Sequence, residues 1–198
     1  MKHFADITSA AERVVDVAED LMQQHGFNGF SYDDVAGRIG IKKPSIHHHF
    51  ATKSELVTVV VQRYTHRVRE YLLAIDGQHG DAPARLRAYA AMFERTYDRE
   101  RRLCLCGMLG AELETLPEQV AGEVKRFFKI NADWLGEVFA EGQAAGTVVG
   151  KPGGKPGAAN LADAYLCALE GAMVVGRGMR SDRSPALVAE TFLSTVLT

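Results

Sequence analysis

Apolar residues recur with a helical period along almost the whole chain. Between residues 9 and 24 the positions Val14, Val17, Ala18, Leu21 and Met22 fall on one face of a repeat of about 3.6 residues. The sequence offers no apolar–polar alternation strong enough to predict a strand. The pattern therefore predicts an all-α protein of about nine helices, near residues 9–24, 31–40, 43–50, 51–75, 83–98, 104–114, 117–145, 158–177 and 185–197.

The second and third of these helices are short and closely spaced. Ser31 is a good N-cap, and Asp34 follows where the helix dipole favours an acid. Gly40 closes this helix, and Pro44 is tolerated only in a first turn, so the next helix must begin near Lys43. Three helices before residue 50, the second and third joined by a tight turn at Gly40, followed by a long helix, are typical of a helix-turn-helix protein.

A glycine- and proline-rich stretch, residues 146–160, is the only segment that is clearly loop-like. The remaining pattern predicts two parts of unequal size. We expect a three-helix helix-turn-helix domain at residues 1–55 and a larger helical domain at residues 56–198.

The composition argues against several classes of protein. The formal net charge is −2, so any attraction to nucleic acid must come from a local patch. We see no apolar run long enough to cross a membrane and no apolar core of a signal peptide at the N-terminus. Three cysteines argue against a disulfide framework, so we expect a cytoplasmic protein with free thiols.

The segment "IKKPSIHHHFATKSE", residues 41–55, is rich in groups that could bind a metal, catalyse a reaction or contact nucleic acid. Adjacent positions on a helix point about 100° apart, so His47, His48 and His49 cannot converge on one ion. A catalytic histidine needs a nucleophile and an orienting group, and the chain has no GxSxG, P-loop or GxGxxG motif. We therefore expect neither a metal, a cofactor nor an enzymatic activity.

Local charge favours nucleic acid. Residues 38–69 hold seven lysines and arginines and one acid, Glu55, which gives this stretch a formal charge of +6. Affinity for DNA comes largely from neutralising phosphates, whereas contacts to base edges specify the sequence. Because the charge coincides with the exposed face of the second helix in a helix-turn-helix, we interpret it as a DNA-binding surface rather than as an ordinary solvated face.

The stretch "GFNGFSYDDVAGRIGIKKPSIHHHFATKSELV" resembles the DNA-binding domain of the TetR family of transcriptional repressors, and the resemblance covers about residues 9–60. It implies that the start of the third helix reads bases and that Lys53 binds a phosphate at a helix N-terminus. His47 stands where the family usually has tyrosine, Phe30 where it has threonine, and Lys42 where it has a serine cap. The DNA-binding residues that we expect are Ser31, Tyr32, Lys42, Lys43, Pro44, Ser45, His47, His48, His49 and Lys53.

The larger domain looks like the family's variable helical region, which binds a small-molecule inducer and forms a homodimer through its two C-terminal helices. The resemblance therefore implies a homodimeric repressor that an inducer releases from a palindromic double-stranded DNA operator. Side chains of the larger domain that could line the inducer site are Tyr89, Phe93, Tyr97, Met108, Phe127, Phe128, Trp134 and Tyr165.

"CLCGMLGAELETLPEQV", residues 104–120, resembles a segment of a subgroup that includes electrophile- and redox-responsive repressors, in which a cysteine occupies the position of Cys104. Arg101 and Arg102 precede this residue, and a helix N-terminus there would lower the pKa of its thiol. The alternative is that Cys104 and Cys106 are small core residues, since free cysteine is among the most buried residue types. A thiol-based sensor that uses the same DNA-binding domain therefore remains the second hypothesis.

Overall fold

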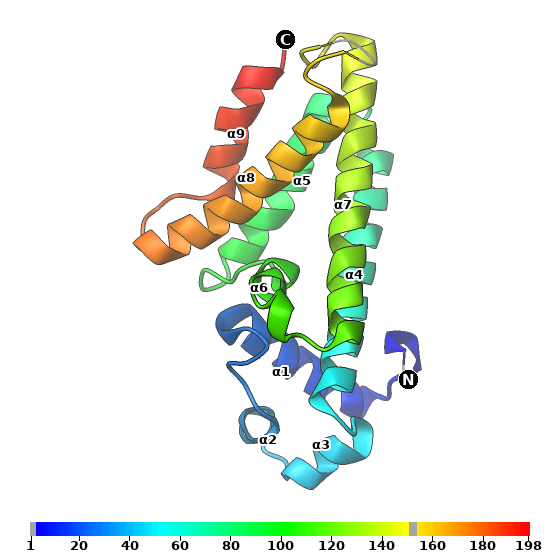
Figure 1. Cartoon of the computed structure of the whole chain (residues 1–198), viewed down its shortest axis with the longest axis vertical. Helices are drawn as coiled ribbons and strands as arrows, with labels where there is room; N and C mark the ends of the chain where they lie inside the picture. Colours follow the sequence, from blue (N-terminus) through cyan, green and yellow to red (C-terminus); the bar gives the residue numbers. More distant parts are fainter. Residues whose placement is uncertain (1–2, 151–153) are drawn as a thin grey trace. The chain divides into compact units, whose positions relative to one another are not determined.

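The computed structural model describes residues 3–150 and 154–198. In these ranges it contains nine α-helices and two short 3₁₀ helices, with one isolated β-bridge between Val148 and Leu197 (Figure 1). The all-α prediction is therefore confirmed. The helices are η1 Phe4–Asp6, α1 Ser9–His25, α2 Tyr32–Ile39, α3 Lys43–His49, α4 Lys53–Gln78, α5 Ala82–Tyr97, α6 Leu105–Ala111, η2 Leu113–Thr115, α7 Glu118–Ala145, α8 Ala158–Met179 and α9 Pro185–Val196.

The ends of α2 and α3 follow the signals in the sequence. The Ser31 hydroxyl accepts a hydrogen bond from the Asp34 backbone N–H, and the Asp34 carboxylate accepts one from the Ser31 backbone N–H at 2.7 Å, which completes a capping box. Gly40 ends α2 in the left-handed region, with φ of 77°. Pro44 occupies the first turn of α3, and Lys42 precedes it without a side-chain cap.

The chain divides into two compact units, and the domain boundary expected at residue 55 stays a prediction. Unit 1 comprises the residues up to Val68 together with Leu105–Phe127, and unit 2 comprises Arg69–Cys104 together with Phe128–Thr198. Residues 105–127 join unit 1 because α6 packs against α1. Within the predicted loop, residues 151–153 lie outside the described part of the chain, and residues 154–157 lead into α8.

Unit 1 is built on α1, which packs against α2, α3 and α6. The side chains of Met22, Ile46 and Phe50 are fully buried there, and burying each of them contributes about 1.5–3 kcal/mol. Tyr32 is also buried, and its hydroxyl donates to the Phe50 carbonyl at 3.0 Å. The hydrogen bond fixes the end of α3 to the start of α2.

Unit 2 is organised by α5, α8 and α9, which pack against one another. Its two fully buried tyrosines are satisfied internally: the Tyr89 hydroxyl donates to Asn131 Oδ1 at 2.8 Å, and the Tyr165 hydroxyl donates to the Leu86 carbonyl at 3.0 Å. Satisfied hydroxyls remove the cost of burying a polar group in an apolar core.

By length and composition α8 could cross a membrane, which corrects the expectation that no apolar run is long enough. The helix has 22 residues and a mean hydropathy of 1.3 over its most apolar window. Core helices of soluble proteins have the same composition, and α8 packs against α5 and α9. It also leaves Val174, Val175 and Met179 exposed.

Candidate nucleic-acid interface

The third helix presents a polar face and buries an apolar one. Ile46 in α3 and Phe50 at its end have no exposed surface, because they pack into the core of unit 1. The opposite side of the helix is exposed and consists of the predicted contact residues Lys42, Lys43, Pro44, Ser45, His47 and His48. A helix with a buried side and a free polar side of this kind can enter the major groove of DNA.

The two lysines at the start of α3 differ in their surroundings. Lys43 Nζ donates to Asp33 Oδ2 at 2.7 Å, and both side chains are largely open to solvent. An exposed pair of this kind contributes about 0–1 kcal/mol, so a phosphate can replace Asp33 at small cost. Lys42 is exposed, and no ion pair involves it within the described residues. Lys42, which immediately precedes α3, is therefore the cation at this end of the helix that is most readily available to a phosphate.

The histidines of α3 have different neighbours. His47 lies with its ring edge-on to Tyr32, 4.8 Å between centroids, and its Nδ1 is 3.3 Å from the Ala51 carbonyl oxygen. The rings of His48 and His49 stand 5.5 Å apart at a steep angle. Within residues 3–150 and 154–198, no three histidine, cysteine or acidic side chains are arranged to hold an ion.

Lys53, which the resemblance assigns to a phosphate, is bound within unit 1. Its ammonium donates to the backbone carbonyls of Phe27 and Phe30 and lies over both aromatic rings, at 4.7 and 4.1 Å from their centroids. Desolvation lowers the pKa of the ammonium, while Glu112 and Asp34 act in the opposite direction. The contacts give Lys53 a structural role in holding the turn between α1 and α2.

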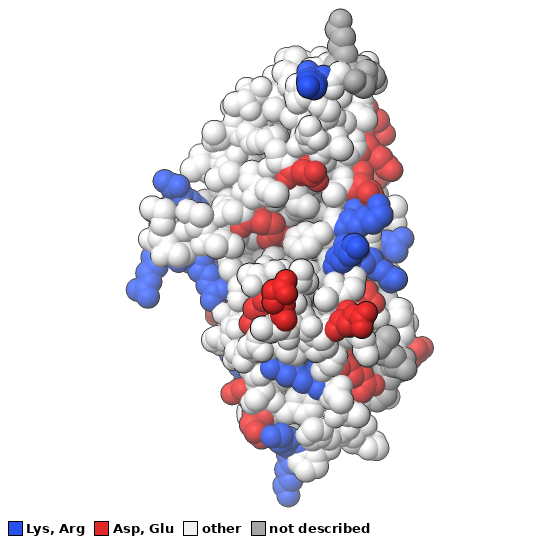
Figure 2. Space-filling view, viewed as in Figure 1, with Lys and Arg blue, Asp and Glu red and all other residues white. Residues whose placement is uncertain are grey.

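The formal charge of residues 38–69 overstates the positive surface. Arg63 pairs with Asp16 at 2.7 Å and with Glu19 at 3.1 Å, and Arg67 also pairs with Glu19. Both acids come from α1, so they are distant in the sequence and close in space. On the face shown in Figure 2, basic and acidic side chains are interspersed and do not form one continuous basic patch.

Two of the predicted contact residues, Ser31 and Tyr32, make hydrogen bonds that stabilise the fold of unit 1. Ser31 is exposed, but its hydroxyl takes part in the capping box of α2. Tyr32 is only 6% exposed, with its hydroxyl bound to Phe50 as described above, so its side chain belongs to the core. Both residues thus set the position of α2 and α3, whereas the other exposed predicted contacts are those at α3, from Lys42 to His48 apart from the buried Ile46.

The aromatic residues predicted to line an inducer site belong to both units. Met108 and Phe127 lie in unit 1, and the others lie in unit 2. Within unit 2 the ring of Tyr89 is the centre of a cluster, with Phe93 at 5.4 Å, Trp134 at 5.5 Å and Tyr165 at 6.4 Å. The structure thus brings together four of the predicted residues from α5, α7 and α8, namely Tyr89, Phe93, Trp134 and Tyr165.

An acid that the sequence analysis did not select, Glu170, lies near this cluster. Glu170 is part-buried as a residue, but its Oε1 atom is buried and has no hydrogen-bond partner in the described chain. Burial raises the pKa of its carboxyl group to about 7, and a hydrogen bond from Cys104 opposes this rise. Glu170 also adds to the effect of burial in raising the pKa of Tyr89. A single acid within the apolar run "YLCALEGAMVV" is the signal that could have identified it.

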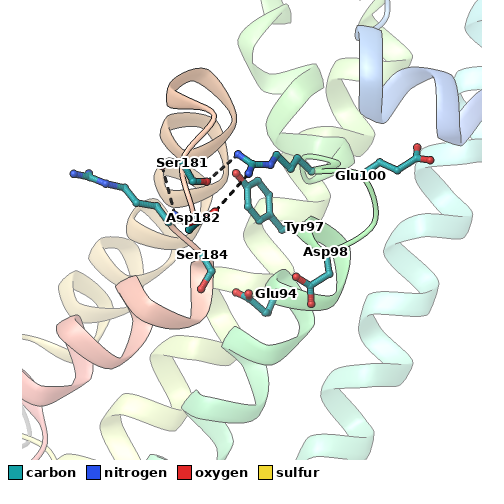
Figure 3. Close-up of a pocket in the computed structure, with 9 residues that line it drawn as sticks. Glu94, Tyr97, Asp98, Glu100, Ser181, Asp182 and Ser184 are labelled. Atoms are coloured by element: carbon teal, nitrogen blue, oxygen red, sulfur yellow. Dashed lines mark hydrogen bonds and ion pairs between the residues drawn. The ribbon is translucent and has the colours of Figure 1, made fainter.

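Unit 2 also contains a polar cleft of about 410 Å³ between the end of α5 and the α8–α9 connection (Figure 3). Arg101 spans it and donates to the Ser181 carbonyl at 2.8 Å. Of the predicted inducer contacts only Tyr97 lines this cleft, and its buried hydroxyl has no partner among the described residues. The cleft is lined by Glu94, Tyr97, Asp98, Glu100, Arg101, Ser181, Asp182, Arg183 and Ser184.

Comparison with known proteins connects these features to regulators of transcription. Residues 14–60 match the family described as bacterial regulatory proteins, tetR family. A crystal structure of a TetR-family transcriptional regulator from Agrobacterium tumefaciens has 30% sequence identity and a TM-score of 0.89, covering 96% of this chain and 98% of the other.

Two curated proteins are similar at lower identity. Transcriptional regulator AcuR of Cereibacter sphaeroides is 25% identical over 173 residues, which is 85% of this chain and 77% of AcuR. IcaR of Staphylococcus epidermidis, a negative regulator of the biofilm operon icaADBC, is 25% identical over 114 residues, and that match spans only 58% of each chain. The similarity to IcaR therefore leaves the rest of that repressor unmatched.

Proposed function

Since the chain belongs to the TetR family and is a helix-turn-helix transcriptional regulator, we propose that it represses transcription as a homodimer on a palindromic operator. We propose further that a small molecule bound in unit 2 releases it from DNA. The observation that carries the first proposal is the exposed polar face of α3 above a fully buried Ile46 and Phe50.

Within this proposal the predicted contacts divide by role. Lys43, Pro44 and Ser45 stand at the start of α3 and reach base edges, while Lys42 and the exposed imidazoles of His47 and His48 contact the backbone. His49 is less exposed and lies beside His48, so it orients that ring.

The homodimer is supported by apolar surface on the last two helices. Val174, Val175 and Met179 of α8 and Leu187 of α9 are between 45% and 60% exposed. A large apolar side chain gains about 1.5–3 kcal/mol when it is fully removed from water, so four on adjoining helices favour association. A palindromic operator requires the same two-fold symmetry.

A ligand in unit 2 is supported by the acid and aromatic groups described above. The buried Oε1 of Glu170 lacks a partner, and an unsatisfied buried acceptor is expected to bind a donor from water or from a ligand. The aromatic cluster of Tyr89, Phe93 and Trp134 in the same unit supplies apolar side chains of the kind that line small-molecule sites.

Selection of binding sites from random-sequence DNA with the full-length protein tests the repressor proposal. We expect the enriched duplexes to contain two inverted half-sites whose centres are a whole number of helical turns apart, about 10 base pairs per turn. Sedimentation of the complex should give two protomers per duplex. Enriched sequences without inverted symmetry, or one protomer per site, would reject the homodimeric repressor.

A thiol-based sensor is the second candidate, and it rests on the contact between Cys104 and Glu170. The thiol donates a hydrogen bond to the carboxyl group, which can therefore accept its proton when an electrophile is attacked. Cys104 is only 2% exposed, which limits it to small reagents.

Operator binding after treatment with N-ethylmaleimide separates the two candidates, with Cys104→Ser as the comparison. If Cys104 is the sensor, alkylation lowers the operator affinity of the wild type but leaves that of Cys104→Ser unchanged. If the wild type is alkylated at Cys104 and still binds its selected duplex, the thiol is not a switch.

A further inference from the structure

The turn between α1 and α2 is held by a carboxylate from a distant part of unit 1. Glu112 lies between α6 and η2, and its Oε2 accepts a hydrogen bond from the Phe27 backbone N–H at 2.5 Å. Its Oε1 accepts from both the backbone and the side-chain amide of Asn28, each at 3.2 Å. Asn28 also donates to Thr115 Oγ1 at 2.9 Å, so η2 contacts the same turn.

Gly26 allows the carboxylate to approach the backbone this closely. A Cβ at this position would lie 2.6 Å from Glu112 Oε2, well inside van der Waals contact. The residue also has φ of 74°, in the left-handed region that favours glycine. The turn is therefore shaped to accept a carboxylate at its N–H groups, as backbone turns do for other anions.

Lys53 binds the backbone carbonyls of the same turn, whereas Glu112 binds its N–H groups. Lys53 is the first residue of α4, and its ammonium donates hydrogen bonds to the carbonyls of Phe27 and Phe30. Phe27 is thus bound at its N–H by Glu112 and at its carbonyl by Lys53. The turn leads directly to Ser31, the cap of α2, and α2 packs against α3.

We propose that Glu112 is a positioning residue for DNA recognition: its carboxylate sets the orientation of α2 and α3 by holding the turn that precedes them. The proposal rests on the DNA-binding function proposed above and adds the contact through which the α6–η2 segment acts on the reading helix. Base contacts depend on the placement of α3 to within a fraction of an ångström, whereas attraction to phosphates depends on charge.

The variant Glu112→Gln provides the test because it keeps the size of the side chain. An amide has only one acceptor atom, and its NH₂ group would face the N–H donors of the turn. Glu114→Gln is the matched control. Glu114 lies two positions after Glu112 and is exposed, so this variant removes the same charge without touching the turn. The probes are a duplex selected from random-sequence DNA with the wild type and an unselected duplex of equal length.

For Glu112→Gln we expect affinity for the selected duplex to fall about tenfold and affinity for the unselected duplex to stay level or rise. Removing a negative charge alone raises both affinities together, and Glu114→Gln should do so. If the two variants change both affinities alike, Glu112 acts only through its charge and the proposal is overturned.

Amide hydrogen exchange in the absence of DNA supplies an independent readout. In folded Glu112→Gln the Phe27 amide should exchange at least about tenfold faster than in the wild type, with no change at buried positions of α1. Unchanged exchange at Phe27 would overturn the proposed hold on the turn. Failure of the wild type to prefer its selected duplex would instead reject the DNA-binding proposal, and amide exchange would still decide the role of Glu112 in the turn.

Discussion

Replacing Glu170 by glutamine should change the pH dependence of stability in a predictable direction. Burial raises the pKa of this carboxyl from 4.5 to about 7, so the folded chain binds the proton more tightly than the unfolded chain does. Below pH 4.5 both states are protonated, and the neutral group in the folded state carries no penalty. As the pH rises toward 7 the unfolded chain ionises first, and unfolding then releases a proton.

The contribution of Glu170 to the free energy of unfolding is therefore highest at low pH, where its carboxyl is neutral in both states. It falls as the pH rises through about 7, after which both states are ionised. Each pH unit in this window costs about 1.36 kcal/mol, so the total loss between pH 4.5 and pH 8 is about 3 kcal/mol. Glutamine does not titrate. The free energy of unfolding of Glu170→Gln, measured relative to the wild type, should accordingly rise by about 3 kcal/mol over this range.

Urea unfolding at four pH values measures this difference, with the protein concentration fixed because a dimer unfolds in a concentration-dependent way. Glu114→Gln serves as the control for an exposed carboxylate. Parallel pH profiles for the wild type and Glu170→Gln would refute the reasoning, because they would place the Glu170 carboxyl in water in the folded protein.

Three further variants test other parts of the structure. Lys53→Met keeps the packing on the aromatic rings but leaves two carbonyls unbound, so unfolding by urea should show a loss of about 1–3 kcal/mol. Lys42→Ala should lower the slope of log affinity against log salt for any DNA by about one, and an unchanged slope would remove Lys42 from the phosphate contacts. Lys53→Met should leave that slope unchanged, which a phosphate contact would not allow. Val175→Glu places a charge on the exposed apolar face of α8 and should shift sedimentation toward the monomer, whereas an intact dimer would place the interface elsewhere.

Local signals predicted where the short helices begin and end. Ser31 caps α2, and Pro44 fixes the first turn of α3, because a helix terminus is decided by the residues within a few positions of it. The buried positions Ile46 and Phe50 also followed from the helical period. These elements required no knowledge of the rest of the chain.

The partners of the charged residues could not be predicted in the same way. Arg63 and Arg67 read as part of a basic surface, yet they bind acids more than forty residues away on α1. The phosphate contact expected of Lys53 stays a prediction, and the carbonyls of Phe27 and Phe30, which the fold brings to its ammonium, could not be read from its neighbours in the sequence. Such pairings depend on how helices pack, which the local sequence pattern does not contain.

The pairing of Arg63 and Arg67 with acids from α1 bears on how such a regulator would search a genome. Binding to arbitrary DNA scales with the number of phosphates that unpaired cations neutralise, and here Arg63 and Arg67 already have an anionic partner in Glu19. We therefore expect such a protomer to dissociate faster from sequences that it does not recognise than a protomer whose arginines are unpaired. Because competing sites in a chromosome outnumber the operator by about a millionfold or more, short dwell times on them leave a larger fraction of a scarce regulator at its target.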